Sequence, residues 1–231
     1  MTPAAWAATA AGVSGVLGWF LPRLVGAIPE RLPDEPQTYR EVASTPGLPA
    51  RLAAAAALVG AVLGWARAGQ PDLVAFVTLG LLGTAMGYVD LRRHLLPDRL
   101  TVPALLVGAV LLGVAALAPG TDAQASYPRA WAAAGGLLLL YLLMALAYPA
   151  GLGLGDVKLA AALGLHLGWL GWAAVVVGTI AAFLVGGLVA IVLLALRRAT
   201  RRSVVPFGPS MLLGALLAVA WAEPVAAWYL S

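Results

Sequence analysis

The sequence of 231 residues contains no cysteine. This absence excludes thiolate nucleophiles, disulfide bonds and zinc sites built on cysteine. The sequence has only two histidines, His94 and His166, and neither has a second ligand at metal-binding spacing. We therefore expect neither a metal nor any other cofactor.

Charge is the second scarce property. Charged residues make up 10% of the chain and hydrophobic residues 62%, whereas a soluble domain carries roughly 25% charged residues. So few charges cannot cover a water-facing surface, and the mean hydropathy of +0.93 agrees. These values exclude a soluble domain and a disordered chain, and they predict a protein whose main solvent is lipid.

Long apolar runs follow one another along the chain, and none has the period-2 alternation of a membrane β-strand. A helix needs about 20 apolar residues to cross a bilayer. We therefore predict an all-α, polytopic membrane helix bundle with about eight transmembrane helices. The expected spans are Ala4–Leu21, Ala50–Ala66, Leu73–Val89, Val102–Ala118, Ala130–Tyr148, Val157–Leu170, Trp172–Leu196 and Phe207–Ala222.

The distribution of basic residues predicts the orientation. With the N-terminus outside, all but two of the 14 Lys and Arg residues fall in inner loops, the exceptions being Arg67 and Arg129. The positive-inside rule then places the chain in the cell inner (plasma) membrane with these loops in the cytoplasm. The net charge of +4 does not indicate nucleic acid, because the basic cluster Arg197–Arg202 is typical of a helix end beside anionic membrane lipid.

Two acidic residues stand at the edges of apolar spans. Asp90 ends the third expected span, and Asp156 begins the sixth. Both edges face the cytoplasm in the predicted topology, so the two carboxylates can meet at one depth. Acidic groups at the edge of hydrocarbon are costly and mark a candidate functional site. The other acidic residues, Asp72 among them, fall in expected loops, where solvation accounts for them.

Glycines precede the second aspartate in Gly153-Leu154-Gly155-Asp156. Residues without Cβ allow another backbone to approach and allow the chain to leave helical angles. Non-helical backbone at membrane depth is tolerated where it packs in protein or lines a wet cavity. We therefore expect Gly153 and Gly155 to help bind an extended peptide substrate beside Asp156.

These residues carry a resemblance to a known family. The segment from Asp90 to Thr101, DLRRHLLPDRLT, resembles the first aspartate motif of prepilin peptidases, which are GxGD-type intramembrane aspartyl proteases. Gly153–Leu159, GLGDVKL, resembles their second motif, and Pro206-Phe207-Gly208-Pro209 a third signature. The resemblance implies a membrane aspartyl endopeptidase with Asp90 and Asp156 as catalytic residues. It also implies a pilin or pseudopilin precursor as substrate, cut after a basic leader peptide that ends in Gly at the cytoplasmic face.

The resemblance covers the chain from about Leu73 to the C-terminus, and it is weaker in the residues before Leu73. Bifunctional members have paired CxxC motifs in an inner loop and also N-methylate the new N-terminus, but this chain has no cysteine. We therefore divide it into 1–51, an N-terminal helix and cytoplasmic loop in place of a methylation region, and 52–231, a membrane peptidase core. We expect peptidase activity without methyl transfer.

Two neighbouring carboxylates cannot both ionise cheaply, so Asp90 and Asp156 would share one proton. The ionised partner would take a proton from water while the protonated partner polarises the scissile carbonyl. Which aspartate is the base stays open, because such a pair titrates as a unit.

Other polar residues have simpler interpretations. Lys158 either binds substrate beside the two aspartates or extends its stem along the membrane edge. His94 is expected to be a solvated loop residue, His166 a packed one, and Asp98 the N-cap of the fourth span. Thr101 and Ser210 lack a base that could activate them as nucleophiles.

A different class of function stays open at this stage. A small transporter, or a non-catalytic membrane subunit of a secretion system, would also be rich in apolar helices. Against a transporter, the acids lie at span ends, and no inverted repeat is visible. The sequence identifies neither the particular pilin nor the oligomeric state.

Overall fold

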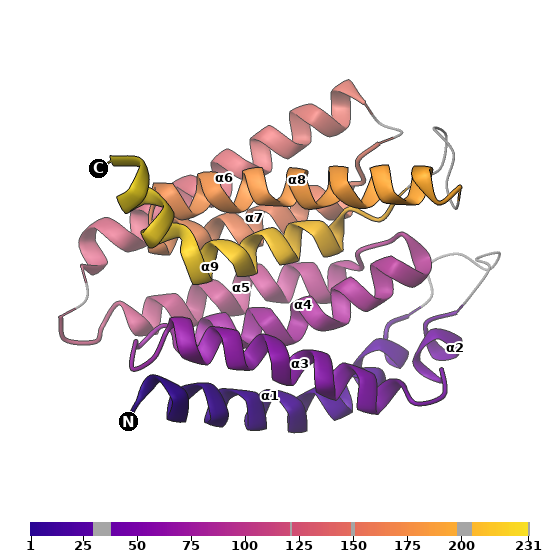
Figure 1. Cartoon of the computed structure of the whole chain (residues 1–231), viewed down its shortest axis with the longest axis horizontal. Coiled ribbons are helices and arrows are strands. Elements are labelled where there is room, and N and C mark those ends of the chain that lie inside the picture. Colours follow the sequence, from indigo (N-terminus) through magenta and orange to yellow (C-terminus); the bar gives the residue numbers. More distant parts are fainter. Residues whose placement is uncertain (30–37, 121, 149–150, 198–204, 231) are drawn as a thin grey trace.

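The computed structural model describes residues 1–29, 38–120, 122–148, 151–197 and 205–230. The described residues form nine α-helices and no strand, which confirms the all-α prediction (Figure 1). The bounds are α1 Pro3–Gly26, α2 Tyr39–Ala43, α3 Leu48–Ala66, α4 Leu73–Arg93, α5 Asp98–Ala115, α6 Ala123–Ala147, α7 Leu154–Leu170, α8 Trp172–Ala195 and α9 Gly208–Leu230. Residues 30–37 of the expected cytoplasmic loop and 198–204 of the basic cluster lie outside the described residues.

Each expected span corresponds to one of the eight longer helices. Six of these, α1, α3, α4, α5, α6 and α8, are long and apolar enough to cross a membrane. Helices suit this environment because all their internal backbone hydrogen bonds are made within one segment. The number of spans and the orientation of the N-terminus stay predictions.

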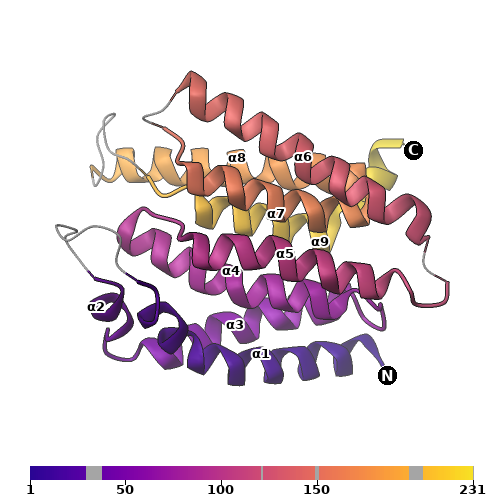
Figure 2. The same cartoon turned by 180° about the vertical axis from the view of Figure 1, so that it is seen from behind.

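The helices run side by side along the long axis of the molecule (Figures 1 and 2). The N-terminus lies at one end of the bundle and α2 at the other, which is also the end of the last turn of α4 and the start of α7. We call the α2 end the inner end and the opposite end the outer end, following the predicted orientation. At the inner end α2 is held against α4, where the Tyr88 hydroxyl donates to the Val42 carbonyl at 3.0 Å.

Small residues bring α1 and α3 together. A Cβ added to Gly60 would lie 2.6 Å from the Ala10 carbonyl oxygen, and one added to Gly64 would lie 2.6 Å from that of Trp6. Only glycine permits this approach, as expected for paired small residues one turn apart in a membrane helix.

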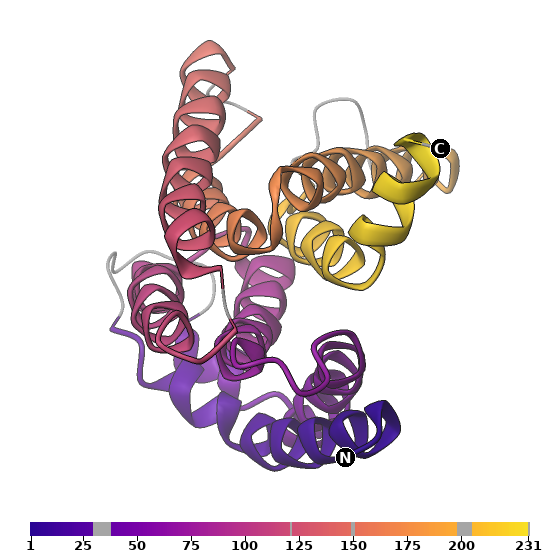
Figure 3. The same ribbon diagram turned by 90° about the vertical axis from the view of Figure 1, so that its left-hand side faces the viewer.

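Helix α7 lies at the centre and is enclosed by α5, α6, α8 and α9 (Figure 3). Its side chains from Leu159 to Trp169 are buried, whereas α8 exposes large apolar residues such as Ile180 and Leu184, as a lipid-facing helix does. Asp156 is therefore carried by the most enclosed helix of the molecule.

Several local expectations were wrong in detail. Helix α1 continues past Leu21 to Gly26, and α6 begins at Ala123, seven residues before the expected start at Ala130. Helix α7 begins at Leu154, so only Gly153 is extended, with φ −83° and ψ 156°, while Gly155 and Asp156 are already helical. The first-turn carboxylate of Asp156 accepts the Gly153 N–H, and this bond lets the helix start earlier than expected.

Candidate active site

Asp90 lies in the last turn of α4 and is 4% exposed. Its Oδ2 accepts a hydrogen bond of 3.0 Å from the backbone N–H of Gly208, the first residue of α9. A Cβ on residue 208 would lie 2.7 Å from that same oxygen. Glycine at 208 is therefore what allows the backbone of α9 to reach the Asp90 carboxylate.

Asp156 lies in the first turn of α7 and is half-buried. Its Oδ2 accepts a hydrogen bond of 3.0 Å from the N–H of Gly153. Burial and the charge of Asp90 raise the pKa of Asp156 to about 6, against the lowering effect of the Gly153 hydrogen bond. The two carboxyl groups lie at the same end of the bundle, where Leu96 contacts the glycine beside each of them.

Leu96 lies between the two aspartates. A Cβ on Gly155 would lie 2.7 Å from Leu96 Cβ, and one on Gly208 would lie 3.2 Å from Leu96 Cδ1. One side chain thus contacts the glycine beside each aspartate, and it joins the start of α7 to the start of α9. The backbone that approaches Gly155 closely is that of Leu96 in this chain, and a role for Gly153 and Gly155 in binding substrate stays a prediction.

Neither aspartate has a cationic partner in the part of the chain that the structure describes. Lys158 points elsewhere, since its Nζ donates to Asp98 Oδ1 at 2.6 Å, and both side chains are partly exposed. Lys158 therefore connects α7 to the start of α5, and its role toward substrate also stays a prediction. Asp98 is not an N-cap: Pro97 occupies that position, and Asp98 is the first helical residue of α5.

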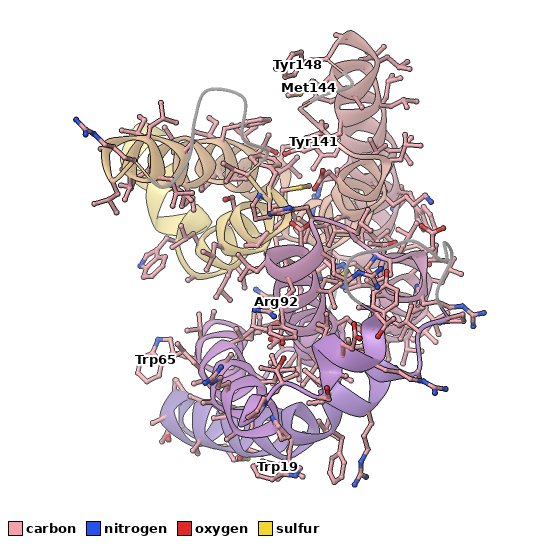
Figure 4. The ribbon with its side chains drawn as sticks, turned by 90° about the vertical axis from the view of Figure 1, so that its right-hand side faces the viewer. Trp19, Trp65, Arg92, Tyr141, Met144 and Tyr148 are labelled. Carbon is pink, nitrogen blue, oxygen red and sulfur yellow. The ribbon has the colours of Figure 1, made fainter. Side chains whose placement is uncertain are left out.

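The Pro206–Pro209 segment is fixed by aromatic packing. Phe207 lies 5.2 Å from Phe183 of α8 and 6.4 Å from Tyr141 of α6, measured between ring centroids. Figure 4 looks onto the inner end and shows Tyr141, Met144 and Tyr148 along α6, with Arg92 at the end of α4. The aromatic contacts hold the Gly208 amide in position beside Asp90. The segment is recognisable in the sequence as a family signature, but nothing in its residues identifies Gly208 as a site residue.

The two histidines lie at different distances from the pair formed by Asp90 and Asp156, since the His94 backbone N–H donates to the Asp90 carbonyl at 2.8 Å and His166 lies farther along α7. His94 ends α4 with φ 52° and serves as its C-cap. His166 is fully buried, as expected for a packed residue, with Nδ1 2.8 Å from the Ala162 carbonyl oxygen. It lies ten residues after Asp156, or about 15 Å along α7 at the helical rise. Among the described residues, no group of three or more His, Asp or Glu side chains is arranged to hold a metal ion.

The hydroxyls considered as nucleophiles are both buried. Thr101 donates to the Pro97 carbonyl at 3.4 Å, a bond within its own helix, and Ser210 is 4% exposed. The chemistry that remains is that of two interacting carboxyl groups, one of them open to solvent. Such a pair can hold one proton and activate a water molecule.

One acidic residue was misjudged from the sequence. Asp72, expected to be solvated in a loop, is 2% exposed at the outer end. It accepts from Arg67 Nε at 3.0 Å, from Arg67 Nη2 at 2.6 Å and from Trp169 Nε1 at 2.6 Å. Asp72 is thus a fully paired structural carboxylate that connects the α3–α4 turn to the end of α7.

The sequence is similar to that of known proteins. Residues 76–191 match the type IV leader peptidase family. The chain is 34% identical to the prepilin leader peptidase/N-methyltransferase of Aeromonas salmonicida (strain A449) and 35% identical to that of Aeromonas hydrophila. Each match covers 64% of this chain and 49% of the relative. It is also 31% identical to the Stutzerimonas stutzeri protein of the same name, over 70% of this chain and 53% of that protein.

The chain thus spans about half the length of the curated relatives that it matches. No solved structure matches it. The matched residues contain both Asp90 and Asp156, and half of the chain lies within the family match. The chain belongs to the type IV leader peptidase family.

Proposed function

We propose that this protein is a membrane aspartyl endopeptidase that removes the basic leader peptide from type IV pilin-like precursors at the cytoplasmic face of the inner membrane. The observation that carries the proposal is the pair formed by Asp90 and Asp156. Among the described residues each of these interacting carboxyl groups has one backbone N–H donor and neither has a cation, so the pair is suited to share a proton. The names of the relatives support the same reaction.

In the proposed mechanism the ionised carboxylate removes a proton from a water molecule, which attacks the scissile carbonyl carbon. The protonated carboxyl donates a hydrogen bond to the carbonyl oxygen and then its proton. The tetrahedral intermediate collapses when the carboxyl group that took the water proton gives it to the amide nitrogen and the other carboxylate recovers a proton from a hydroxyl of the intermediate. The C–N bond then breaks, and the amine leaves as the new N-terminus. No covalent link to the protein forms, which agrees with the buried, unactivated state of Thr101 and Ser210.

The cytoplasmic position of the site rests on the basic residues. Arg92 and Arg93 flank Asp90, and Lys158 follows Asp156. By the positive-inside rule this end of the bundle faces the cytoplasm. The absence of cysteine leads us to propose leader removal without methyl transfer.

The test is co-expression of this chain with a pilin gene from the same genome, followed by mass measurement of the pilin N-terminus. We expect loss of the leader without the added mass of a methyl group. The variants Asp90→Asn and Asp156→Asn should leave the precursor intact while inserting normally. Cleavage by either variant would contradict the two-carboxylate mechanism.

A further inference from the structure

An apolar groove of about 420 Å³ lies between two halves of the bundle, one containing α3 and α4 and the other containing α7 and α9. It is lined by α3 and α4 on one side and by α7 and α9 on the other. Figure 3 looks along the bundle and shows α3 and α9 flanking α4 and α7. The direct contacts of α9 with α3 and α4 are sparse compared with those that it makes with α8. The groove is therefore an opening where the halves meet, and not a gap within either half.

The groove extends over most of the membrane thickness. Along α4 its lining runs from Phe76 to Leu91, which is about 22 Å at the rise of an α-helix. The hydrocarbon core of a bilayer is about 30 Å thick. The lining is almost entirely apolar, and Arg51 contributes a charged side chain at the inner end.

The inner end of the groove adjoins the candidate active site. Leu91 follows Asp90, and Gly87 lies one turn before it. On the facing helix, Pro209 follows Gly208, whose N–H binds the Asp90 carboxylate. A segment lying in the groove would thus have its inner terminus beside Asp90.

We propose that this groove binds the apolar helix of the precursor and thereby delivers the scissile bond to Asp90 and Asp156; the inference rests on the proposed function. With the scissile bond at the inner end of the bound helix, the first turn of that helix lies at the two carboxylates. The groove begins there and is apolar along its length. A second cavity, between α6, α7, α8 and α9, has only about 10 Å³ and cannot hold a helix face.

The walls of the groove are suited to a helix. A segment that enters lipid must satisfy its own backbone hydrogen bonds and so enters as a helix. Gly83 and Gly87 of α4 lie one turn apart, and small residues let a second helix approach closely. The neighbour nearest both glycines is the flexible end of Leu212, which would lie 2.9 Å from a Cβ added to Gly83 and 3.6 Å from one added to Gly87. A change of rotamer at Leu212 would open this face to the substrate.

The first experiment narrows the groove with Ala55→Trp, and Ala54→Trp is its matched control. Both alanines are exposed neighbours on α3, but only Ala55 lines the groove. The full chain in phosphatidylcholine–phosphatidylglycerol vesicles would be assayed on an intact precursor. We expect Ala55→Trp to raise KM about tenfold with kcat nearly unchanged, as for loss of uniform binding, and Ala54→Trp to change neither. Equal kinetics for the two variants would overturn the proposal.

The second experiment uses the absence of cysteine, which makes single-cysteine cross-linking specific. Leu213→Cys places a thiol in the groove, and Leu184→Cys places one on the exposed side of α8. A precursor with one cysteine in its apolar helix should form a disulfide with the first variant and not with the second. Cross-linking through position 184 alone would overturn the proposal. A photoreactive phospholipid tests the alternative that the groove binds lipid. If it labels position 213 and excess precursor does not reduce the labelling, the groove is a lipid site and the proposal is overturned.

The experiments distinguish an error in the proposed groove from an error in the proposed function. If the wild-type protein does not shorten the precursor, the proposed function is wrong. If it does so and the groove variants behave like their controls, only the position of the substrate helix is wrong.

Discussion

The two ends of α7 use carboxylates in opposite ways. At the outer end Asp72 accepts three hydrogen bonds, two of them from the guanidinium of Arg67. At the inner end Asp90 and Asp156 each accept a single bond from a backbone N–H. A buried carboxylate that is fully paired can stay ionised and is fixed in place. A pair without a cation is free to bind and release a proton, which is what catalysis requires.

The arginines at the outer end strengthen the contrast. Arg129 donates from Nε to the Gly168 carbonyl and from Nη2 to the Trp169 carbonyl, each at 2.8 Å. These carbonyls belong to the last turn of α7, where helical partners are missing and a positive charge is favourable. Arg67 and Arg129, the two basic residues that the predicted topology places outside, thus both anchor one helix end. These contacts fix the outer end of α7, and Asp156 lies at the opposite end of the same helix.

The largest expected effect is on catalysis. Asp90→Asn or Asp156→Asn should abolish detectable cleavage, a fall in kcat beyond the roughly 10²- to 10⁴-fold that a single acid–base group usually contributes. Folding should be unaffected or improved, because neither carboxylate gains a salt bridge from being charged. Precursor cleavage and thermal unfolding in detergent measure the two quantities. If a variant lost stability in proportion to activity, the aspartate that it replaces would have a structural role like that of Asp72.

The opposite result is expected at the outer end. Asp72→Asn removes the negative charge that pairs with the half-buried Arg67 guanidinium and should cost roughly 3–5 kcal/mol of stability. Cleavage per folded molecule should stay near that of the wild type. Asp122→Asn is the control, since Asp122 is exposed at the start of α6. Equal melting temperatures for the two variants would contradict a structural role for Asp72.

The contact between Asp90 and α9 can be tested by one methyl group. Gly208→Ala would place Cβ 2.7 Å from Asp90 Oδ2 and should displace either the carboxylate or α9. Misplacement of a reacting group by about 1 Å can cost about 10²-fold in rate. Gly187→Ala on α8 has no atom within 4 Å of its added methyl and serves as the control. Undiminished turnover by Gly208→Ala would mean that the close approach is not needed for catalysis.

A smaller effect is expected for Arg129. Arg129→Met removes two hydrogen bonds from a charged donor to α7 and should lower stability by about 1.5–3 kcal/mol. Chemical denaturation in mixed micelles would measure this. Because the change lies at the outer end, the KM for the precursor should not move. A change in KM alone would indicate that the end of α7 contributes to substrate binding.

The smallest effect on stability is expected at the exposed ion pair of Lys158 and Asp98, where either single neutralisation should cost roughly 0–1 kcal/mol. The pair also separates the two interpretations of Lys158. If Lys158 binds substrate, Lys158→Met should raise KM while Asp98→Asn does not. If it only joins α7 to α5, the two variants should have the same kinetics.

Much of this arrangement was predictable because the bilayer restricts the chain so strongly. Apolar runs predicted the eight longer helices, and the position of Asp90 and Asp156 at the ends of such runs identified both. Gly208 could not be assigned to the site from the sequence, because it contributes a backbone N–H, and every residue except proline has one. Asp72 was misjudged because its partner Trp169 lies 97 positions away, and nothing local predicts that contact. Asp98 was expected to cap α5, but Pro97 is extended and takes that position.

The position of the Asp90 donor has a consequence for biosynthesis. Asp90, Asp156 and Gly208 belong to α4, α7 and α9, in the order in which these helices leave the ribosome. A nascent chain that has inserted α7 already contains both carboxyl groups, but the amide that holds Asp90 arrives only with the start of α9. The candidate site is thus completed only by α9, so a nascent chain that has inserted no helix beyond α8 enters the membrane without an assembled site.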